Sequence, residues 1–160
     1  MIAFRVGSHR FNYRAAAVVF DDGYLLLHRL EGDEFWALPG GRVNPGERAQ
    51  DAIRREFLEE LDVSVECGEL LCTGENFFEH EGEPHHEIGL YFAATLPASG
   101  GVVDKNLAHL GSERGRQLVF RWFLLHDLPH IDLRPSALKK ALASGSLPAH
   151  FVQGDEAKAL

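Results

Sequence analysis

The hydrophobic positions of the chain fall mainly into short runs that predict β-strands. Residues 14–20 are nearly all apolar, which is typical of a strand covered on both faces. Asp-Asp-Gly at 21–23 is a hairpin signal, and residues 24–29 return as the partner strand. Further strand patterns occur at residues 1–6, 63–67, 69–78, 86–96 and 119–125.

The central helix is predicted from a different spacing. Ile53, Phe57 and Leu61 recur at i, i+4 and i+8, so they form one apolar stripe along a helix. The sequence Asn-Pro-Gly at 44–46 predicts a tight turn that leads the chain into this helix near Glu47.

The order of elements predicts one α+β domain. Strands surround the central helix, and a second helix follows at 134–144, entered through a proline and stopped by a glycine. This order predicts a sandwich built on a mixed sheet. With 160 residues, 45% of them apolar, the chain fits a single domain over 1–160 with its core at about 12–145. Beyond residue 148 the chain has little pattern.

The longest irregular stretch is predicted at residues 99–117. Long loops in compact domains are usually lids or binding segments. Glu113 is the only glutamate of this stretch, with Gly111 and Gly115 as hinge candidates on either side of it. Glu113 is therefore either a contributor to a site or a plain surface residue.

Three carboxylates crowd one face of the central helix. Glu56, Glu59 and Glu60 stand at i, i+3 and i+4, so they share an arc of roughly 100°. Like charges at i, i+4 destabilise a helix by about 0.2–0.5 kcal/mol, and acids near its C-terminus face the negative end of the dipole. A divalent cation would compensate this repulsion. The alternative is a solvated helix neutralised by its neighbouring arginines.

The segment around this helix resembles the Nudix box. Gly41, Glu47 after five residues, and Arg55-Glu56-Phe57-Leu58-Glu59-Glu60-Leu61 after seven more match the pattern G-x5-E-x7-R-E-U-x-E-E-x-G-U. Asp62 departs from it, because the family has glycine at that position. The resemblance implies the Nudix fold, an α/β/α arrangement in which a mixed sheet lies between helices.

The resemblance also implies roles for box residues. Glu56, Glu59 and Glu60 match the family's metal-binding carboxylates, and Gly40 matches its ligand through the main-chain carbonyl. Such oxygen ligands suit Mg²⁺, with Mn²⁺ as the alternative.

Two further box residues are implied to support the ligands. Arg55 would orient the glutamates, and Glu47 would tie the loop to the helix by pairing with Arg55. The general base is open between Glu56 and Glu113, since this role varies in the family. At Asp62, we expect a left-handed helix cap, a small effect on stability and no loss of activity.

The expected reaction is metal-dependent hydrolysis of a phosphoanhydride in a nucleoside diphosphate linked to another group. Nucleoside triphosphates, nucleotide sugars and ADP-ribose are the substrate types, and the products are a nucleoside monophosphate and the phosphorylated second group. The family's substrate markers after the box, a proline or a tyrosine, are missing from Asn-Phe-Phe-Glu-His at 76–80. A Nudix-fold binding or sensor module without catalysis is the alternative, although such modules normally lack box glutamates.

Residues outside the box are candidates for substrate contact. Arg14 and Arg42 are candidate phosphate ligands, and Phe78 is a candidate for stacking on a base, as are Phe77 and Tyr13. Aromatic residues on strands are more often part of the core.

Histidines cluster at positions 80, 85 and 86 beside several glutamates. Their spacing favours a polar hairpin loop over a metal site, with substrate contact as an intermediate option.

Charge and composition narrow the partners. The net charge of −8 argues against stable nucleic-acid binding, which depends on basic residues. Cys67 and Cys72 lack C-x-x-C spacing, and the charged opening segment does not predict a signal peptide. No apolar run reaches the ~20 residues of a membrane span. We expect a cytoplasmic protein with a small nucleotide substrate; a homodimer, frequent in the family, is one alternative.

Overall fold

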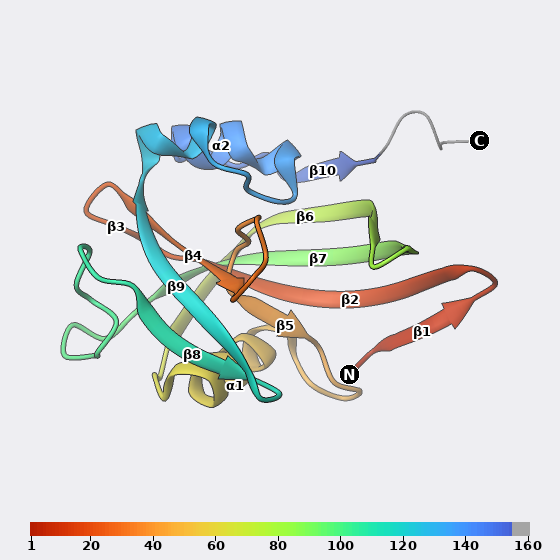
Figure 1. The fold of residues 1–160 in the computed structure, drawn as a ribbon, viewed down its shortest axis with the longest axis horizontal. Coiled ribbons are helices and arrows are strands. Elements are labelled where there is room, and N and C mark those ends of the chain that lie inside the picture. The colour runs from red at the N-terminus through yellow and green to blue at the C-terminus, as the bar shows by residue number, and fades with distance from the viewer. Residues whose placement is uncertain (155–160) are drawn as a thin grey trace.

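The computed structural model describes residues 1–154 and arranges the strands in two sheets (Figure 1). The larger sheet has the order β1-β2-β7-β6-β10, with β5 beside β2, and the smaller has the order β3-β4-β9-β8. The strands are β1 (Ala3–Val6), β2 (His9–Val18), β3 (Phe20–Asp21), β4 (Tyr24–Leu30), β5 (Gly40–Arg42), β6 (Glu66–His80), β7 (Glu83–Thr95), β8 (His109–Glu113), β9 (Arg116–Leu124) and β10 (His150–Gln153). The helices are α1 (Ala49–Leu61), α2 (Lys139–Ser144), and the 3-10 helices η1 (Leu125–His130) and η2 (Ser136–Leu138).

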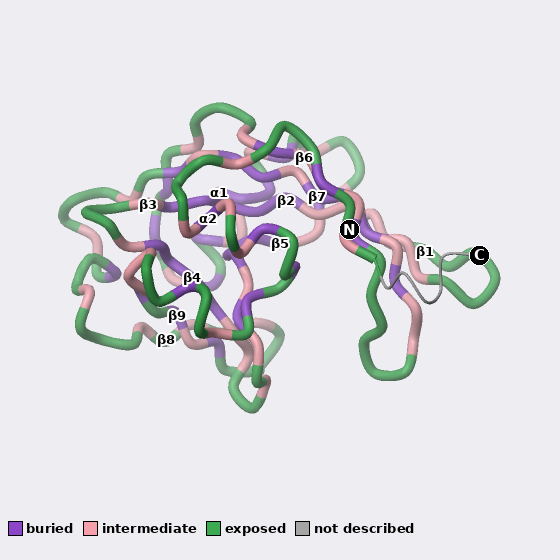
Figure 2. Tube along the Cα trace, turned by 90° about the horizontal axis from the view of Figure 1, so that it is seen from above, coloured by how far each residue is buried: buried purple, intermediate pink, exposed green. Residues whose placement is uncertain are grey.

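Helices lie on both sides of the sheets, so the predicted α+β fold with a mixed sheet between helices is confirmed. The larger sheet is the mixed one, and the smaller sheet is antiparallel throughout. The residues of the apolar run in β2 pack alternately into the cores on the two faces of the sheet. Ala15 and Ala17 belong to the cluster that includes Phe57 of α1, whereas Ala16 and Val18 belong to the cluster formed with the C-terminal helices. Figure 2 shows the buried chain concentrated where these layers meet.

The predicted hairpin at 21–23 is present, but its first strand is much shorter than expected. Of residues 9–21, only Phe20 and Asp21 pair with β4 in antiparallel register, while residues 9–18 lie in the larger sheet. Val19 is the point at which the chain passes from one sheet to the other. A continuous apolar run contains no signal for such a change of sheet, because both sheets bury their residues there.

Strands β1, β2, β6 and β7 extend beyond the helices as an arm (Figure 1). β2 begins at His9 rather than at residue 14, and it runs parallel to β7. One face of β2 in this arm presents Arg10, Asn12 and Arg14 to a cleft. The first residues of β2 are largely polar, so the hydrophobic pattern did not predict them as part of the strand.

The prediction of an irregular stretch at 99–117 is wrong in its second half. β8 pairs with β9 in antiparallel register from His109 to Glu113. Gly111 is packed against the carbonyl oxygen of Glu60, so it is not a hinge; Gly115 lies in the turn that follows, at φ +79°. Strand pairing through glycine and serine gives no apolar alternation for a sequence pattern to detect.

The C-terminal region also departs from the prediction. The helix expected at 134–144 is a 3-10 turn followed by the short α2, and the patternless tail contains β10, which pairs in parallel with β6. The last positions of the predicted domain, 155–160, lie outside the described residues. Within residues 1–154, no helix has the length and apolar character needed to span a membrane.

Candidate active site

The glycine loop meets α1 where no side chain fits between them. A Cβ added to Gly41 would overlap the carboxyl group of Glu56, and one added to Gly40 would overlap the carbonyl oxygen of Ala15. Backbone approach of this kind is possible only for glycine. The structure therefore holds the Gly40 main chain and the first box glutamate in one place.

Arg55 links the loop to the helix. Its Nε and Nη2 donate to the two carboxylate oxygens of Glu47 at 2.7 and 3.1 Å, a bidentate pair, and Nη2 also donates to the Arg42 carbonyl at 3.1 Å. Nη1 donates to Glu56 at 2.7 Å and to Glu59 at 3.4 Å. Hydrogen bonding from Arg55 lowers the pKa of Glu47. The expected pairing of Arg55 with Glu47 is present, and so are its contacts with two of the glutamates.

Glu60 is the buried carboxylate of the set, at 8% exposure. Burial raises the pKa of Glu60 to about 9, with smaller contributions from the charges of Glu56 and Glu113 and an opposing one from Arg14. An ionised carboxylate at this depth needs a positive partner. Arg14 is directed instead to the Leu38 carbonyl, to which its Nη2 donates at 3.0 Å.

Glu113 lies at the same site, although it does not come from a loop. It ends β8 and lines the cleft together with the box glutamates. Gly111 brings this strand against the last turn of α1, because a Cβ there would lie 2.6 Å from the Glu60 carbonyl oxygen. Strand pairing thus fixes a fourth carboxylate near the three of the helix.

Asp62 takes the conformation that the box glycine would take. It ends α1 at φ 55° and ψ 39°, in the left-handed region; its N–H donates to the Leu58 carbonyl at 3.0 Å, and the Val63 N–H donates to the Phe57 carbonyl at 3.3 Å. Aspartate tolerates this region better than most residues. The expected left-handed cap is confirmed, and the departure from the box leaves the helix end intact.

Carboxylate oxygens are the ligands that a hard divalent cation prefers. The side chains of Glu56, Glu59, Glu60 and Glu113 could supply oxygen ligands to such an ion, and the buried Glu60 carboxyl would gain a positive partner from it. Within residues 1–154, no three His, Cys, Asp or Glu side chains are already close enough together to hold a metal ion. Glu56 and Glu59 are turned toward Arg55. Binding a metal through these two residues would therefore require their side chains to turn away from Arg55.

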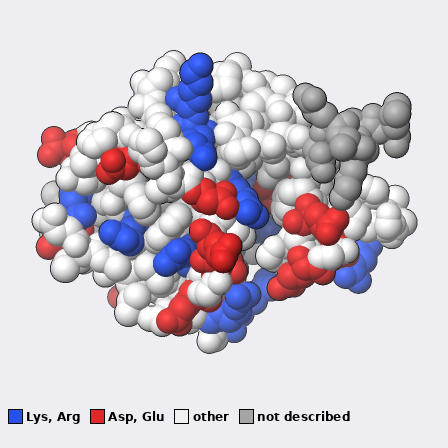
Figure 3. All heavy atoms as spheres, turned by 45° about the horizontal axis from the view of Figure 1, so that its top comes forward, with Lys and Arg blue, Asp and Glu red and all other residues white. Residues whose placement is uncertain are grey.

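These residues stand at one end of a large cleft of about 1710 Å³. Typical small-molecule sites measure roughly 300–1,000 Å³, so the cleft has room for an extended substrate. Arg14 and Arg42 both line it, as predicted candidates, and lie directly opposite each other on β2 and β5. Figure 3 shows acidic and basic side chains interleaved over the middle of the face that it presents.

The aromatic candidates separate between two faces. Phe78 lines the cleft, is 36% exposed, and stacks on His85 with ring centroids 4.8 Å apart. Tyr13 packs against the core cluster on the α1 side, and the Phe77 ring packs on His86 at 4.5 Å. Phe77, at 39% exposure, also lines the cleft, so both phenylalanines remain candidates for stacking on a base, whereas Tyr13 is not among the lining residues.

The clustered histidines lie on a polar hairpin, as their spacing favoured. His80 ends β6 and His85 lies at the start of β7, on either side of the connecting turn. His85 is buried and its Nδ1 lies 2.9 Å from Asn12 Nδ2. It lines the cleft, which keeps substrate contact open for this residue.

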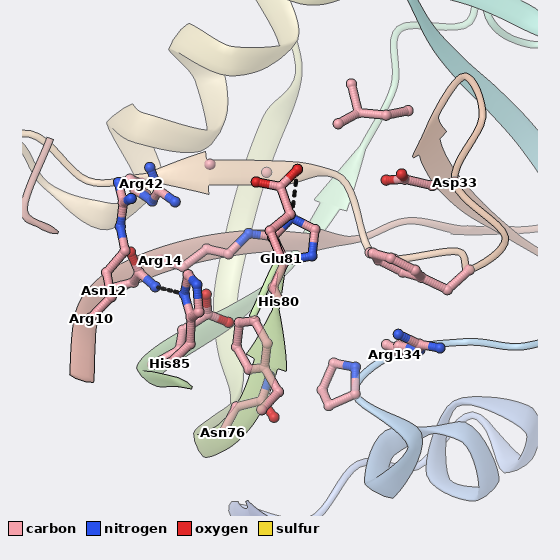
Figure 4. Close-up of a pocket in the computed structure, with 18 of the residues that line it drawn as sticks. Arg10, Asn12, Arg14, Asp33, Arg42, Asn76, His80, Glu81, His85 and Arg134 are labelled. Atoms are coloured by element: carbon pink, nitrogen blue, oxygen red, sulfur yellow. Dashed lines mark hydrogen bonds and ion pairs between the residues drawn. The ribbon is translucent and has the colours of Figure 1, made fainter. Parts of the chain in front are cut away.

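Several cleft residues were not predicted from the sequence. Asn12, Asn76 and Glu87 are each at most 8% exposed, and all line the cleft from the larger sheet. Figure 4 shows Asn12, His85 and the arginines of β2 and β5 on one side of the cleft, with Asp33 and Arg134 on the other. Alternation along β2 could have grouped Asn12 with Arg14, had the strand been extended to its true start.

His28 of β4 is a further buried cleft residue. It packs on Phe120 at 5.2 Å, and its Nδ1 has no hydrogen-bond partner within the described part of the chain. Burial, assisted by the charge of Arg14, lowers the pKa of His28 to about 3. The imidazole is therefore neutral in the folded protein at physiological pH.

We expect His28 to make folding stability decrease in acid. The unfolded histidine has a pKa of about 6.5, so between that value and about 3 the unfolded chain binds the additional proton. Acidification in this range costs up to ~1.4 kcal/mol of stability per pH unit. Replacing His28→Gln should remove this slope, measured as the difference in unfolding free energy between pH 7 and 4.5. The exposed His126→Gln variant is the control, and equal slopes in wild type and His28→Gln would contradict the assignment.

Comparison with known proteins places the chain in a family. A family model described as "NUDIX domain" matches residues 10–144, which include the box, both flanking strands and Glu113. The chain belongs to the Nudix family.

Sequence relatives match mainly over short segments. The nucleoside triphosphatase NudI of Escherichia fergusonii is 47% identical over 49 residues, which are 28% of this chain and 35% of that protein. The RNA pyrophosphohydrolase of Serratia proteamaculans is 34% identical over 59 residues, 37% of this chain and 34% of that protein. A putative ADP-ribose pyrophosphatase, YjhB of Bacillus subtilis, is 29% identical over 84 residues, 52% and 40% of the two chains. The matched segments span about a third to two fifths of these relatives.

Solved structures match over most of the chain. The MutT Nudix hydrolase from Burkholderia pseudomallei has a TM-score of 0.59 and 29% identity, covering 82% of this chain and 95% of that one. The E. coli ORF135 protein has a TM-score of 0.56 and 24% identity, covering 88% and 94%. These likenesses confirm the Nudix fold.

Proposed function

We propose that the protein hydrolyses a phosphoanhydride bond in a nucleoside diphosphate linked to another group, with a divalent metal as cofactor. The observation that carries this proposal is the position of Glu60. It is a buried carboxylate next to Glu56 and Glu113, and it lines the cleft that Arg14 also lines. Such a group gains most from a cation, and an anionic substrate in turn requires one.

Each box residue then has a task. Glu56, Glu59 and Glu60 would hold the metal together with the Gly40 carbonyl, and Mg²⁺ or Mn²⁺ suits this oxygen set. When bound, the metal would neutralise the charge on the phosphate oxygens and orient the reacting groups. Arg55 fixes Glu56 relative to the loop through its bonds to Glu47. Rigid placement of the ligands keeps the reacting bond in one position.

The arginines of the cleft would bind the phosphates. Arg14 and Arg42 sit opposite each other at the box end of the cleft, and desolvation with the nearby charges of Arg10 and Arg114 lowers the pKa of Arg42. Positive groups that repel one another gain from an anion placed between them. Guanidinium groups also match phosphate geometry through paired hydrogen bonds.

The experiment that tests this function is a hydrolysis panel with product analysis in Mg²⁺. Nucleoside triphosphates, nucleotide sugars, ADP-ribose and dinucleoside polyphosphates are incubated with the full chain. Pyrophosphate plus a monophosphate would identify a triphosphate pyrophosphatase, and two monophosphates would identify a nucleotide-sugar or ADP-ribose enzyme. Binding of nucleotide and Mg²⁺ without any turnover would favour a binding module and overturn the proposal.

Glu113 is predicted to take part in this reaction. Glu113→Gln should lower kcat by about tenfold or more, because a positioned general base contributes at least that much, whereas folding should be unaffected at this strand end. Turnover of the preferred substrate with saturating Mg²⁺ measures the effect. The control is Glu66→Gln, an exposed position at the start of β6 outside the cleft lining. An unchanged rate in Glu113→Gln would remove this residue from the mechanism and leave Glu56 as the base.

A further inference from the structure

A row of buried polar side chains in the cleft has no task in the reaction proposed above. Asn12 of β2, Glu87 of β7 and Asn76 of β6 are register partners across three adjacent strands. His85 lies two residues before Glu87 on the same strand, so it faces the same side of the sheet. All four line the cleft at 1–8% exposure.

The hydrogen bonding of this row is incomplete. Asn12 Nδ2 lies 2.9 Å from His85 Nδ1, but Asn12 Oδ1 has no partner within the described residues. Asn76 makes a side-chain hydrogen bond with Glu87, whose pKa is nevertheless raised by burial. Leaving a buried polar atom unpaired is unfavourable, because the hydrogen bonds that it made with water are not replaced. A row kept only for stability would be expected to pair all of its groups.

The surroundings of the row suit a flat ring. Phe78 stacks on His85 beside the row, at 36% exposure and with an interplanar angle of 17°. Arg134 lies across the cleft from the row (Figure 4). Its guanidinium carbon lies 4.5 Å from the centroid of the Phe35 ring. The cleft thus offers apolar and π-rich surfaces at its sides and hydrogen-bonding groups on its floor.

The row is also connected to the proposed reaction centre. Arg14 lies two residues after Asn12 on β2, on the same face of the strand, and pairs in register with Arg42 of β5, the strand that also contains Gly40 and Gly41. Its charge acts on both Glu60 and Glu87. A substrate with phosphates at Arg14 and Arg42 could extend its other end along β2 toward Asn12.

From this arrangement we infer that Asn12, Asn76, His85 and Glu87 form the specificity site for the nucleobase of the substrate. Asn12 Oδ1 accepts a hydrogen bond from an N–H group on the edge of the base. The Glu87 carboxyl, which is hydrogen-bonded to Asn76, makes a hydrogen bond with the neighbouring atom of the same edge. Phe78 covers part of the ring face. This inference rests on the proposed function for the position of the phosphates, but its test does not require turnover.

The test is calorimetric binding of AMP, GMP, CMP and UMP, with ribose 5-phosphate as the matched ligand without a base. Wild type should bind at least one nucleotide about tenfold or more tightly than ribose 5-phosphate, since one well-made hydrogen bond and a stacked ring are each worth up to that factor. In Glu87→Gln and Asn12→Leu, this preference should fall by about tenfold, while ribose 5-phosphate binding changes less than about twofold.

Glu75→Gln is the control, because Glu75 lies on β6 one residue before Asn76, pairs with His150, and is outside the cleft lining. It should bind all ligands like wild type. Equal weakening of nucleotides and ribose 5-phosphate in the two variants would overturn the inference, as would equal affinity of wild type for all five ligands. If base preference is present and disappears in the variants while the substrate panel shows no hydrolysis, the base site stands and the hydrolase proposal fails.

Discussion

The Glu60→Gln variant should lose nearly all hydrolytic activity while retaining its fold. Glutamine keeps the size of the side chain but removes a carboxylate that would hold the metal at the floor of the cleft. Loss of a metal ligand should lower kcat by at least about 100-fold, equivalent to ~2.7 kcal/mol of transition-state stabilisation. Steady-state turnover of the preferred substrate at saturating Mg²⁺ measures this loss.

The free energy of unfolding of Glu60→Gln distinguishes loss of a metal ligand from loss of the fold. The pKa of Glu60 is raised to about 9, so from its ordinary value of 4.5 up to 9 the folded protein holds a proton that the unfolded chain releases. Stability from this group is therefore present below about 4.5 and is lost as pH rises toward 9. At pH 8 without metal, Glu60→Gln should be more stable than wild type by roughly 1–3 kcal/mol. A fully active Glu60→Gln protein would contradict the assignment of the metal site.

The Arg55→Lys variant should lose both activity and stability, although the charge is kept. Lysine cannot reproduce the bidentate pair with Glu47 or reach Glu56 and the Arg42 carbonyl together. We expect about 1–2 kcal/mol less stability in denaturant unfolding and a roughly 10- to 100-fold lower kcat, because charge-assisted hydrogen bonds of a partly buried side chain are lost.

Arg54→Lys is the matched control for this change. Arg54 is the preceding residue on α1 and pairs with the exposed Asp51 at 2.8 Å. Surface pairs of this kind contribute little, so its stability should stay within about 0.5 kcal/mol of wild type. Equal changes in stability and kcat in the two variants would show that the Arg55 contacts do not organise the site.

The box region could be predicted from sequence because its determinants are local. The turn at 44–46, the apolar stripe of Phe57 and its neighbours, and the glutamates at helical spacing all lie within one short segment. The structure places them as expected, with Gly41 against Glu56 and Arg55 bonded to Glu47. Asp62 also caps the helix as foreseen.

The rest of the cleft depends on contacts between distant segments. Asn12, Asn76 and Glu87 become neighbours only through parallel pairing of β2 with β7 and antiparallel pairing of β6 with β7. The position of Glu113 likewise depends on β8 pairing with β9 and on the close approach allowed by Gly111. Register of this kind is set by the whole sheet and has no signature in a local pattern.

The most direct test of the central proposal is the metal dependence of hydrolysis. Protein treated with a chelator is assayed on its preferred substrate before and after Mg²⁺ is restored, with Mn²⁺ as the second ion. We predict negligible turnover in chelator, recovery on adding either ion, and no recovery in Glu60→Gln at the same concentrations. Hydrolysis at the full rate in chelator, or equal recovery in the variant, would contradict a metal held by the box carboxylates.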